Sequence, residues 1–343
     1  MTNKMNTKRL SRHNILRTFL VAILAVGLQP TLSQTLVRAN RQVHFKDSVP
    51  AGNYSGIAHL YDNVYALADD KAPYDGYRKV EIVVDSINGE IKSVADRGYV
   101  TSNVKNRDTE GIVYVKNSGT LMTIGEADSK IICYSDDCQN IVKELQLEKG
   151  TGNSSYESLC HDEESGVIYA CTEAPLPADD DANHDKIRIQ AFDLNFNKIG
   201  NWMYHTDKPA SKKDKAGVYA FGVSELMAYD SHTLLVLERE AYVPKKKIGA
   251  WTICKLYKVD LSQSGNVGRA EKAADVSIPT VRKQLLHRWK TKMNLTHQNF
   301  ANYEGMCIGP RLSDGSATVI LVADSQNQSH GILRDWFKTI VVR

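Results

Sequence analysis

The stretch Glu110-Gly-Ile-Val-Tyr-Val-Lys-Asn-Ser-Gly-Thr-Leu-Met-Thr-Ile-Gly-Glu126 decides the fold of this chain. It contains an apolar strand, a polar turn at residues 117–119, and a second apolar strand that ends on a carboxylate. Asn, Ser and Gly tolerate the backbone angles that a tight reversal needs. The stretch is therefore predicted to form a β-hairpin with an acidic residue at each end.

The same pattern of strand, polar turn and strand occurs five times along the chain. The first strands begin at residues 55, 110, 157, 224 and 304. The second strands end on carboxylates, namely Asp69, Glu126, Glu173, Glu238 and Asp324. A hairpin that recurs through 343 residues is typical of a β-propeller, in which each blade is a sheet of four strands. We therefore predict an all-β fold, a β-propeller of five or six blades, with a two-sheet sandwich as the alternative.

The segments between the hairpins are predicted to supply the remaining strands of the blades. They are short, apolar and bounded by turn residues, as at residues 131–134, 141–147, 187–192, 198–204 and 251–259. The long interval between residues 224 and 304 leaves room for a sixth blade. Its basic part, residues 280–290, is instead predicted to be a helical insertion.

The register of the hairpins brings like charges together. Residues equidistant from the turn centre lie opposite one another in an antiparallel hairpin. The resulting acidic pairs are Glu110 with Glu126, Glu157 with Glu173, and Glu304 with Asp324. Like charges directly opposite each other are destabilising, so a cation, a shared proton or an arginine is expected beside them. The alternative is that these carboxylates are splayed, solvated strand ends.

The first 33 residues differ in composition from the rest. Five basic residues and no acidic ones occur there, followed by an apolar run at residues 18–28 and then Pro30. These are the parts of a secretory signal peptide, and the run is shorter than the roughly 20 residues that span a bilayer. We expect a signal peptide at 1–33 and an exported protein, periplasmic, extracellular or on the cell surface, without a stable membrane span. An uncleaved membrane anchor is the alternative.

Charge and cysteine content narrow the class of protein further. Without the five basic residues of the leader, the formal net charge of +3 becomes about −2, which gives no support for a nucleic-acid surface. All six cysteines follow the leader, which fits an oxidising compartment. Cys160 and Cys171 flank a predicted turn and can face each other, but buried reduced thiols fit the pattern equally well. The disulfide pairing stays open.

Several motifs, taken together, resemble the family called esterase-like activity of phytase. They are Glu110-Gly-Ile112, Tyr156-Glu-Ser-Leu159, Thr172-Glu-Ala-Pro-Leu176, Gly222-Val-Ser-Glu-Leu226, Leu235-Val-Leu-Glu-Arg239, Asn302-Tyr-Glu-Gly-Met-Cys-Ile-Gly-Pro310 and Leu321-Val-Ala-Asp324. The resemblance runs from about residue 43 to the C-terminus. It implies an exported phytase-like propeller domain, at 34–343, that is suspected of phosphoester hydrolysis.

If the first strands of the repeats are the innermost ones, their acidic ends converge on the propeller axis at one face and form a ring of carboxylates. Such a ring without a His or Cys ligand set favours a hard divalent cation, calcium first and magnesium next. The candidate metal ligands are Glu126, Glu173, Glu225, Glu238, Asp324 and Asp69. The candidate catalytic residues are Glu110, Glu157, Glu304 and Arg239. The planar fork of Arg239 can grip two phosphate oxygens, or it can simply balance the flanking Glu238 and Glu240. His59 and His161 can act as general bases or can be ordinary outer-strand or turn residues.

The function expected from these observations is an exported metal-dependent phosphoric-ester hydrolase. Its substrate would be a small phosphoester. We expect a monomer, with neither nucleic acid nor a membrane as a partner. Two alternatives are a calcium-dependent lactonase or ester hydrolase, and a non-catalytic propeller whose acidic ring binds an ion or a cationic ligand. A serine hydrolase, a zinc protease and a P-loop protein are not supported, because their motifs are absent from the sequence.

Overall fold

The protein was analysed as a computed structural model that describes residues 34–211, 213–246, 248–262, 267, 279–329 and 333–343. The signal peptide predicted at 1–33 lies outside the described residues. Within the described part, strands dominate, and the helices are two 3-10 turns, Gly152–Ser154 and Lys213–Lys215. None of the described helices has the length and apolar character needed to cross a membrane.

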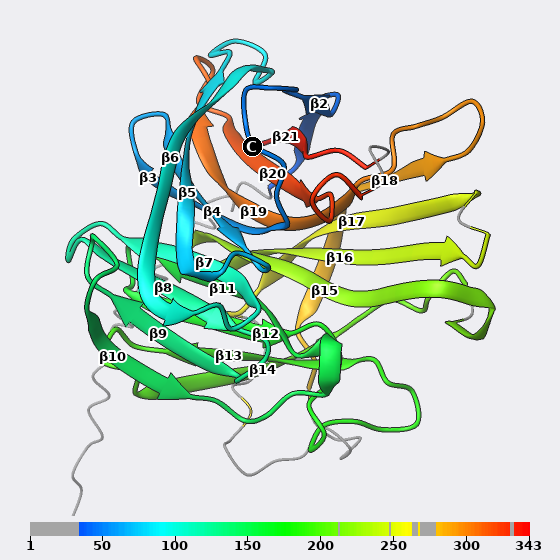
Figure 1. Cartoon of the computed structure of the whole chain (residues 1–343). Coiled ribbons are helices and arrows are strands. Elements are labelled where there is room, and N and C mark those ends of the chain that lie inside the picture. Colours follow the sequence, from blue (N-terminus) through cyan, green and yellow to red (C-terminus); the bar gives the residue numbers. More distant parts are fainter. Residues whose placement is uncertain (1–33, 212, 247, 263–266, 268–278, 330–332) are drawn as a thin grey trace, which may run out of the picture. The chain divides into compact units, whose positions relative to one another are not determined.

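The strands of the described residues form five separate sheets, each the blade of a propeller (Figure 1). Blade 1 contains β3 (Tyr54–Tyr61), β4 (Val64–Asp69), β5 (Tyr74–Val84) and β6 (Ile91–Lys105). Blade 2 contains β7 (Thr109–Val115), β8 (Thr120–Gly125), β9 (Lys130–Tyr134) and β10 (Ile141–Gln146). Blade 3 contains β11 (Tyr156–Asp162), β12 (Val167–Thr172), β13 (Lys186–Phe192) and β14 (Lys198–His205).

The remaining two blades contain the longest strands and the closure of the ring. Blade 4 contains β15 (Ala216–Asp230), β16 (Thr233–Pro244), β17 (Ala250–Asp260) and β18 (Arg282–Met293). Blade 5 contains β19 (Asn302–Arg311), β20 (Ala317–Asp324), β21 (Trp336–Val342) and β1 (Leu36–Ala39), with β2 (Val43–His44) also paired to β21. Strands from both ends of the described chain therefore complete one sheet.

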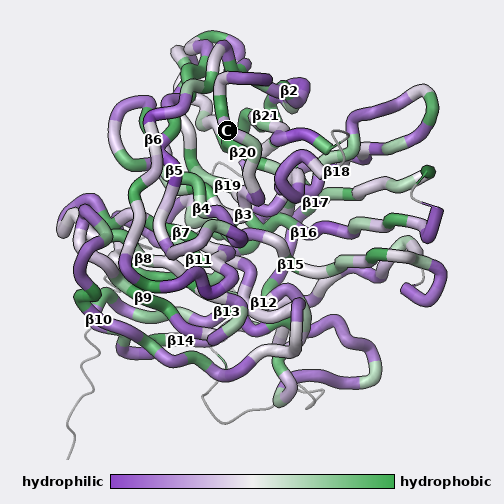
Figure 2. Tube along the Cα trace, viewed as in Figure 1, coloured by the Kyte–Doolittle hydropathy of each residue, from purple (hydrophilic) through white to green (hydrophobic). Residues whose placement is uncertain are grey.

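The first strand of each repeat is the innermost one. Strands β3, β7, β11, β15 and β19 each begin a sheet, and each contacts the next around the ring, with β19 returning to β3. This arrangement confirms the all-β propeller and fixes its blades at five. The hydrophobic cores lie between neighbouring blades; one contains Ile189 of blade 3 with Val236 of blade 4. Figure 2 shows the matching mixture of hydrophobic and hydrophilic residues along the strands.

The prediction of a helical insertion at residues 280–290 is wrong, because residues 282–290 lie in β18, the outermost strand of blade 4. A bulge explains the error. Tyr257 pairs with Leu285 and Leu256 pairs with His287, so Leu286 is an extra residue in the ladder. The extra residue interrupts the alternation of period two that marks a strand. A sixth blade is not built from the described residues of this interval.

The predicted register of the innermost hairpins also needs correction. Thr109 pairs with Gly125 and Gly111 pairs with Ile124, so Glu110 sits in a β-bulge and has no residue directly opposite it. The other four innermost hairpins shift register at the equivalent place, releasing Ser55, Glu157, Ser224 and Glu304. A bulge adds one residue to one strand and redirects its side chain. The acidic residues therefore lie at the same end of each hairpin without forming cross-strand pairs.

Small residues follow the bulges because the innermost strands approach one another closely. A Cβ atom on Gly111 would lie 2.6 Å from the backbone nitrogen of Leu159, and one on Gly56 would lie 2.6 Å from the carbonyl oxygen of Glu110. Either contact is too short for a side chain. In β15 the equivalent position is held by Glu225, which sets this residue apart from the other acidic residues.

Candidate functional site

Eight carboxylates gather where the innermost strands begin, and we call them the acidic ring. They are Asp70, Asp108, Glu110, Glu126, Glu157, Glu173, Glu304 and Asp324. They come from the bulges, from the ends of the second strands, and from the connections that follow β4 and β6. These carboxylates lie close enough together to raise one another's pKa values. The structure thus brings together carboxylates from several blades.

In the part of the chain that the structure describes, the positive charges that contact this ring are those of Arg239 and Lys71. Arg239 is 3% exposed, and its guanidinium donates to Glu173, to Glu304 and, at 3.0 Å, to Asn302 Oδ1. These partners belong to blades 3 and 5, whereas Arg239 lies on β16 of blade 4. Arg239 therefore forms salt bridges, as the alternative predicted. Its partners are carboxylates from other blades and not the flanking Glu238 and Glu240.

Glu110 and Glu157 are the unpaired members of the ring. They are 6% and 7% exposed, and within the described residues neither carboxylate has a hydrogen bond or an ion pair. Burial raises the pKa of both groups well above the usual range, and neighbouring carboxylates raise them further: first Glu157 for Glu110, and first Glu173 for Glu157. Buried carboxylates normally have partners, so these two acceptors are available to a ligand.

A tighter group within the ring contains Asp70, Asp108 and Glu110. One carboxylate oxygen of each lies within 4.8 Å of the other two, a spacing that can hold a metal ion. The ammonium of Lys71 lies 2.9 Å from Asp70 Oδ2 and also contacts Asp108. Burial raises the pKa of Asp70 to about 6, although Lys71 opposes this shift. This is the one such group among the described residues.

Two ring members have pKa values near neutrality. Burial raises the pKa of Glu126 to about 7, with the backbone N–H of Ser155, 3.0 Å away, opposing the shift. Burial also raises the pKa of Glu304 to about 7, with the nearby guanidinium of Arg239 opposing it. Groups with such values exchange protons readily near pH 7. The ring therefore contains both proton-transferring and cation-binding candidates.

Three of the six predicted metal ligands lie outside the ring, and two of them, Glu238 and Asp69, belong to second strands of their hairpins. Glu238 accepts hydrogen bonds from Tyr204 at 2.7 Å and from Lys283 at 2.6 Å. Successive side chains of a strand point to opposite faces, so Arg239 faces the ring and Glu238 does not. Asp69 likewise accepts the backbone N–H of Lys71 at 3.1 Å, and the next residue, Asp70, takes part in the ring instead.

Glu225 is also separate from the ring, although it is buried on an innermost strand. Its carboxylate accepts the backbone N–H of Leu226 at 2.9 Å and also those of Leu159 and Met306. These donors belong to blades 3, 4 and 5. Burial raises the pKa of Glu225 well above its usual range, and the three N–H groups oppose that shift. Its arrangement is that of a structural group joining three blades.

The predicted histidines lie farther along the innermost strands. His59 Nε2 lies 2.9 Å from the carbonyl oxygen of Asp62, in the turn after β3. His161 and His59 line a cavity of about 70 Å³ together with Cys160, Met227 and other mostly apolar residues. No member of the acidic ring lines this cavity, so neither histidine contributes a base to the ring.

The cysteines are all free and buried. Ser158, and not Cys160, pairs with Cys171 across the hairpin, because the register places Cys160 opposite Tyr169. The possible bridge between Cys160 and Cys171 is therefore absent. The alternative of buried reduced thiols is the one observed.

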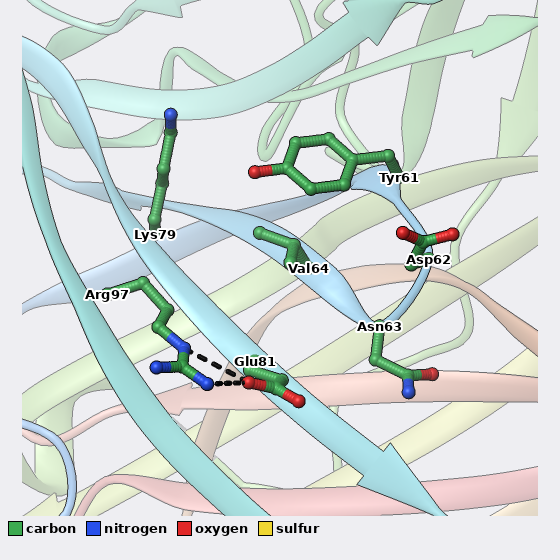
Figure 3. Close-up of a pocket in the computed structure, with 7 residues that line it drawn as sticks. All are labelled: Tyr61, Asp62, Asn63, Val64, Lys79, Glu81 and Arg97. Atoms are coloured by element: carbon green, nitrogen blue, oxygen red, sulfur yellow. Dashed lines mark hydrogen bonds and ion pairs between the residues drawn. The ribbon is translucent and has the colours of Figure 1, made fainter.

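A surface cavity of about 500 Å³ lies on blade 1, beside the turn between β3 and β4 (Figure 3). Its lining includes Tyr61, Lys79 and the ion pair of Arg97 with Glu81. Figure 3 shows Arg97 paired with Glu81, with Lys79 and Tyr61 apart from this pair, so the side chains do not converge on one point. None of them belongs to the acidic ring, so this cavity is not the candidate site.

Sequence reasoning missed Asp70, Asp108 and Lys71 as site residues. Asp70 directly follows the hairpin carboxylate Asp69, and the sequence alone does not show which of these two side chains faces the ring. Asp108 precedes its bulge by two residues and has a φ of 60°, a conformation that Asp adopts more readily than most residues. An Asp just before a strand that begins with Thr-Glu-Gly was the available signal.

Comparison with known proteins adds one family match. A model of the phytase-like family, described as esterase-like activity of phytase, matches residues 49–326. No curated protein matches the chain.

Solved structures show only distant similarity. A glutaminyl cyclase from Myxococcus xanthus is 10% identical with a TM-score of 0.39, covering 89% of this chain and 97% of its own. A streptogramin B lyase is 12% identical with a TM-score of 0.38, covering 89% and 98%. A chain of a nidogen–laminin complex is 12% identical with a TM-score of 0.38, covering 84% of each chain. Likenesses of this degree carry no argument about function.

Proposed function

Because the chain belongs to the phytase-like family, described as esterase-like activity of phytase, we propose that it is an exported metal-dependent phosphoric-ester hydrolase acting at the acidic ring. The observation that carries this proposal is the pair of buried carboxylates without partners, Glu110 and Glu157, among neighbours of the same charge. Such an arrangement is unfavourable without a counter-ion or protons. A divalent cation supplies that counter-ion.

The donor set fits a hard divalent cation. The oxygens of Asp70, Asp108 and Glu110 lie within 4.8 Å of one another, and all are carboxylate oxygens. Calcium and magnesium prefer such ligands. The ammonium of Lys71 already contacts two of the three residues, which shows that the position accepts positive charge. A bound cation would hold phosphate oxygens and lower the pKa of a bound water.

A cation is also needed for the substrate. A phosphoester carries negative charge, and eight carboxylates facing it without a counter-ion would repel it. The guanidinium of Arg239 is not available to attract the phosphoester, because it already forms ion pairs with Glu173 and Glu304. Its role in the proposal is to hold these two glutamates in place. Positive charge toward the substrate would come from the bound ion.

The chain's own residues then divide the remaining tasks. Glu110, Asp70 and Asp108 would hold the cation. Glu304 and Glu126, whose pKa values are raised to about 7, would accept a proton from water or return one to the leaving group. Glu173 and Arg239 would orient Glu304. This assignment keeps Glu110, Glu304 and Arg239 at the reaction centre, gives Glu157 no separate task, and changes the predicted ligand set.

The substrate class and location belong to the same proposal. We propose a small phosphoester as substrate, because the ring is formed by side chains of a few neighbouring strand ends. The acidic character of the ring disfavours nucleic acid as a partner. The basic leader followed by an apolar run supports export, with the mature protein acting as a monomer outside the cytoplasm.

The proposal is tested by phosphate release in a chelator-treated and metal-restored assay. We expect the purified protein to release phosphate from p-nitrophenyl phosphate or inositol phosphates with calcium or magnesium, and not with EDTA. The double variant Glu110→Gln with Glu157→Gln should lose this activity, whereas Glu144→Gln, which breaks the outer ion pair with Lys130 on blade 2, should keep it.

Other outcomes would identify the alternatives. Turnover of lactones or carboxylic esters without phosphate release would replace the substrate class. Tight cation binding with no turnover of any ester would make the protein a binding propeller.

A further inference from the structure

Lys71 lies in the turn between β4 and β5 and bridges two carboxylates of the acidic ring. Its ammonium is 2.9 Å from Asp70 Oδ2 and contacts Asp108 as well. The Lys71 side chain is 58% exposed, whereas those of Asp70 and Asp108 are 18% and 29% exposed. The ammonium therefore approaches from the solvent side and contacts two less exposed acids.

The same two acids belong to the group that can hold a metal ion, and the third member is Glu110. Glu110 is 6% exposed and has no hydrogen bond or ion pair in the described chain. Lys71 thus neutralises two members of the group and leaves the most buried one without a partner. One ammonium charge does not satisfy three carboxylates.

A metal ion at this position and the ammonium of Lys71 would share two carboxylates, those of Asp70 and Asp108. An ion bound by Asp70, Asp108 and Glu110 would lie beside the ammonium, and its charge would repel Lys71. The two occupants therefore exclude each other. A ligand that must displace an internal group binds with an affinity reduced by the fraction of time that the site is open.

We propose that Lys71 is an internal competitor of the divalent cation, which occupies the site in the metal-free protein and leaves it when the cation binds. The proposal rests on the proposed function, because it concerns the cation of that same site. Two consequences follow from the competition. Lys71 stabilises the metal-free ring, and it sets the cation concentration at which the site fills.

The test measures calcium binding by isothermal titration calorimetry on the chelator-treated full chain. Lys71→Met removes the ammonium and keeps an unbranched side chain, and we expect its Kd for calcium to be about tenfold lower than that of the wild type. Lys71→Arg keeps the positive charge, so its Kd should stay close to the wild-type value. The matched control is Lys92→Met, because Lys92 is 50% exposed and also bridges two carboxylates, Asp85 and Glu90, on the outer part of blade 1.

A second readout follows the metal-free protein. In EDTA the melting temperature of Lys71→Met should lie below that of the wild type, because two carboxylates, Asp70 and Asp108, lose their counter-charge. Calcium should raise the melting temperature of this variant more than that of the wild type. The Lys92→Met control should show neither effect.

The results separate this inference from the proposed function. Equal calcium affinity in the wild type and Lys71→Met would overturn the competition and leave the hydrolase proposal standing. Tighter binding by Lys71→Met without phosphate release from any ester would support the competition and overturn the hydrolase. Absence of calcium and magnesium binding in both proteins would overturn the competition together with the metal dependence.

Discussion

Glu225 and Glu110 are two buried carboxylates on innermost strands, one at a position after a bulge and the other within one. Glu225 is 2% exposed and accepts three backbone N–H groups from three blades. Glu110 is 6% exposed and has no partner in the described chain. Burial raises the pKa of both, but the Glu110 shift is increased by other carboxylates, whereas backbone donors oppose the Glu225 shift.

The difference teaches how to separate structural from functional acids. A buried charge that the backbone satisfies contributes to the fold, because its hydrogen bonds repay its desolvation. A buried charge left without donors is held there by the rest of the structure and is available to a ligand. By this criterion Glu225 is structural, and Glu110 and Glu157 belong to the site.

The largest loss of stability is expected at Arg239, which neutralises two glutamates of the ring. Arg239→Met would leave Glu173 and Glu304 buried without their cation, so we expect a loss of about 3–5 kcal/mol in the free energy of unfolding. Urea unfolding at neutral pH measures this loss. Arg239→Lys, which keeps the charge but not the fork, should lose less. A loss below about 1 kcal/mol, typical of exposed pairs, would contradict the buried bridge.

A somewhat smaller effect is expected at Glu225. Glu225→Ala leaves three backbone N–H groups without their acceptor, and we expect a loss of about 2–4 kcal/mol. Glu225→Gln keeps an acceptor oxygen and should retain most of the stability. If calcium binding by Glu225→Gln fell together with that of Glu110→Gln, the distinction between a structural and a functional acid would be lost.

The pH dependence in EDTA should be a more moderate effect. The pKa values of Glu126 and Glu304 are raised from the ordinary 4.5 to about 7. Between these values the folded protein binds more protons than the unfolded chain, so its stability should fall as pH rises through this window. The melting temperature in EDTA should therefore decrease from pH 5 to pH 8. Calcium should reduce the slope, and a rising melting temperature would contradict the shifts.

The smallest effect is expected at Glu110 itself. Glu110→Gln removes one of several repelling charges, so in EDTA it should stabilise the protein by about 1 kcal/mol. The same variant should lose the calcium-dependent rise in melting temperature. Glu144→Gln should show neither the stabilisation in EDTA nor the loss of the calcium-dependent rise, because Glu144 lies on the outer strand of blade 2, where it pairs with Lys130. Destabilisation by Glu110→Gln in EDTA would assign Glu110 a structural role like that of Glu225.

Much of the fold followed from local chemistry. Turns such as Asn117-Ser-Gly119 and the apolar strands around them predicted the innermost hairpins, and most of the outer strands were predicted as well. The bulge at Glu110 was not predicted, because a single extra residue leaves no mark in composition. The same limitation turned β18 into a predicted helix, since Leu286 breaks the alternation at its bulge.

The candidate site was harder to predict than the blades. The sequence placed carboxylates at one end of the hairpins, but it did not decide which face of a strand each one occupied. Thus Glu238 was grouped with the ring while its neighbour Arg239 is the residue that faces it. Lys71 pairs with Asp70 and with Asp108, 37 residues away, and Arg239 pairs with residues 65 and 66 positions away. The packing of adjacent blades brings these groups together.

The pairing of β1 with β21 has a consequence for how freely the chain can be rearranged. The backbone N–H of Thr35 donates to the carbonyl oxygen of Arg343 at 2.7 Å, and the reverse bond measures 3.0 Å. Because these ends are adjacent, a short linker between residues 343 and 34 would allow new termini in the exposed connection at residues 148–149. In such a circular permutant every blade would be built from consecutive strands, and the chain would begin at blade 3 while the blades kept their cyclic order in the ring.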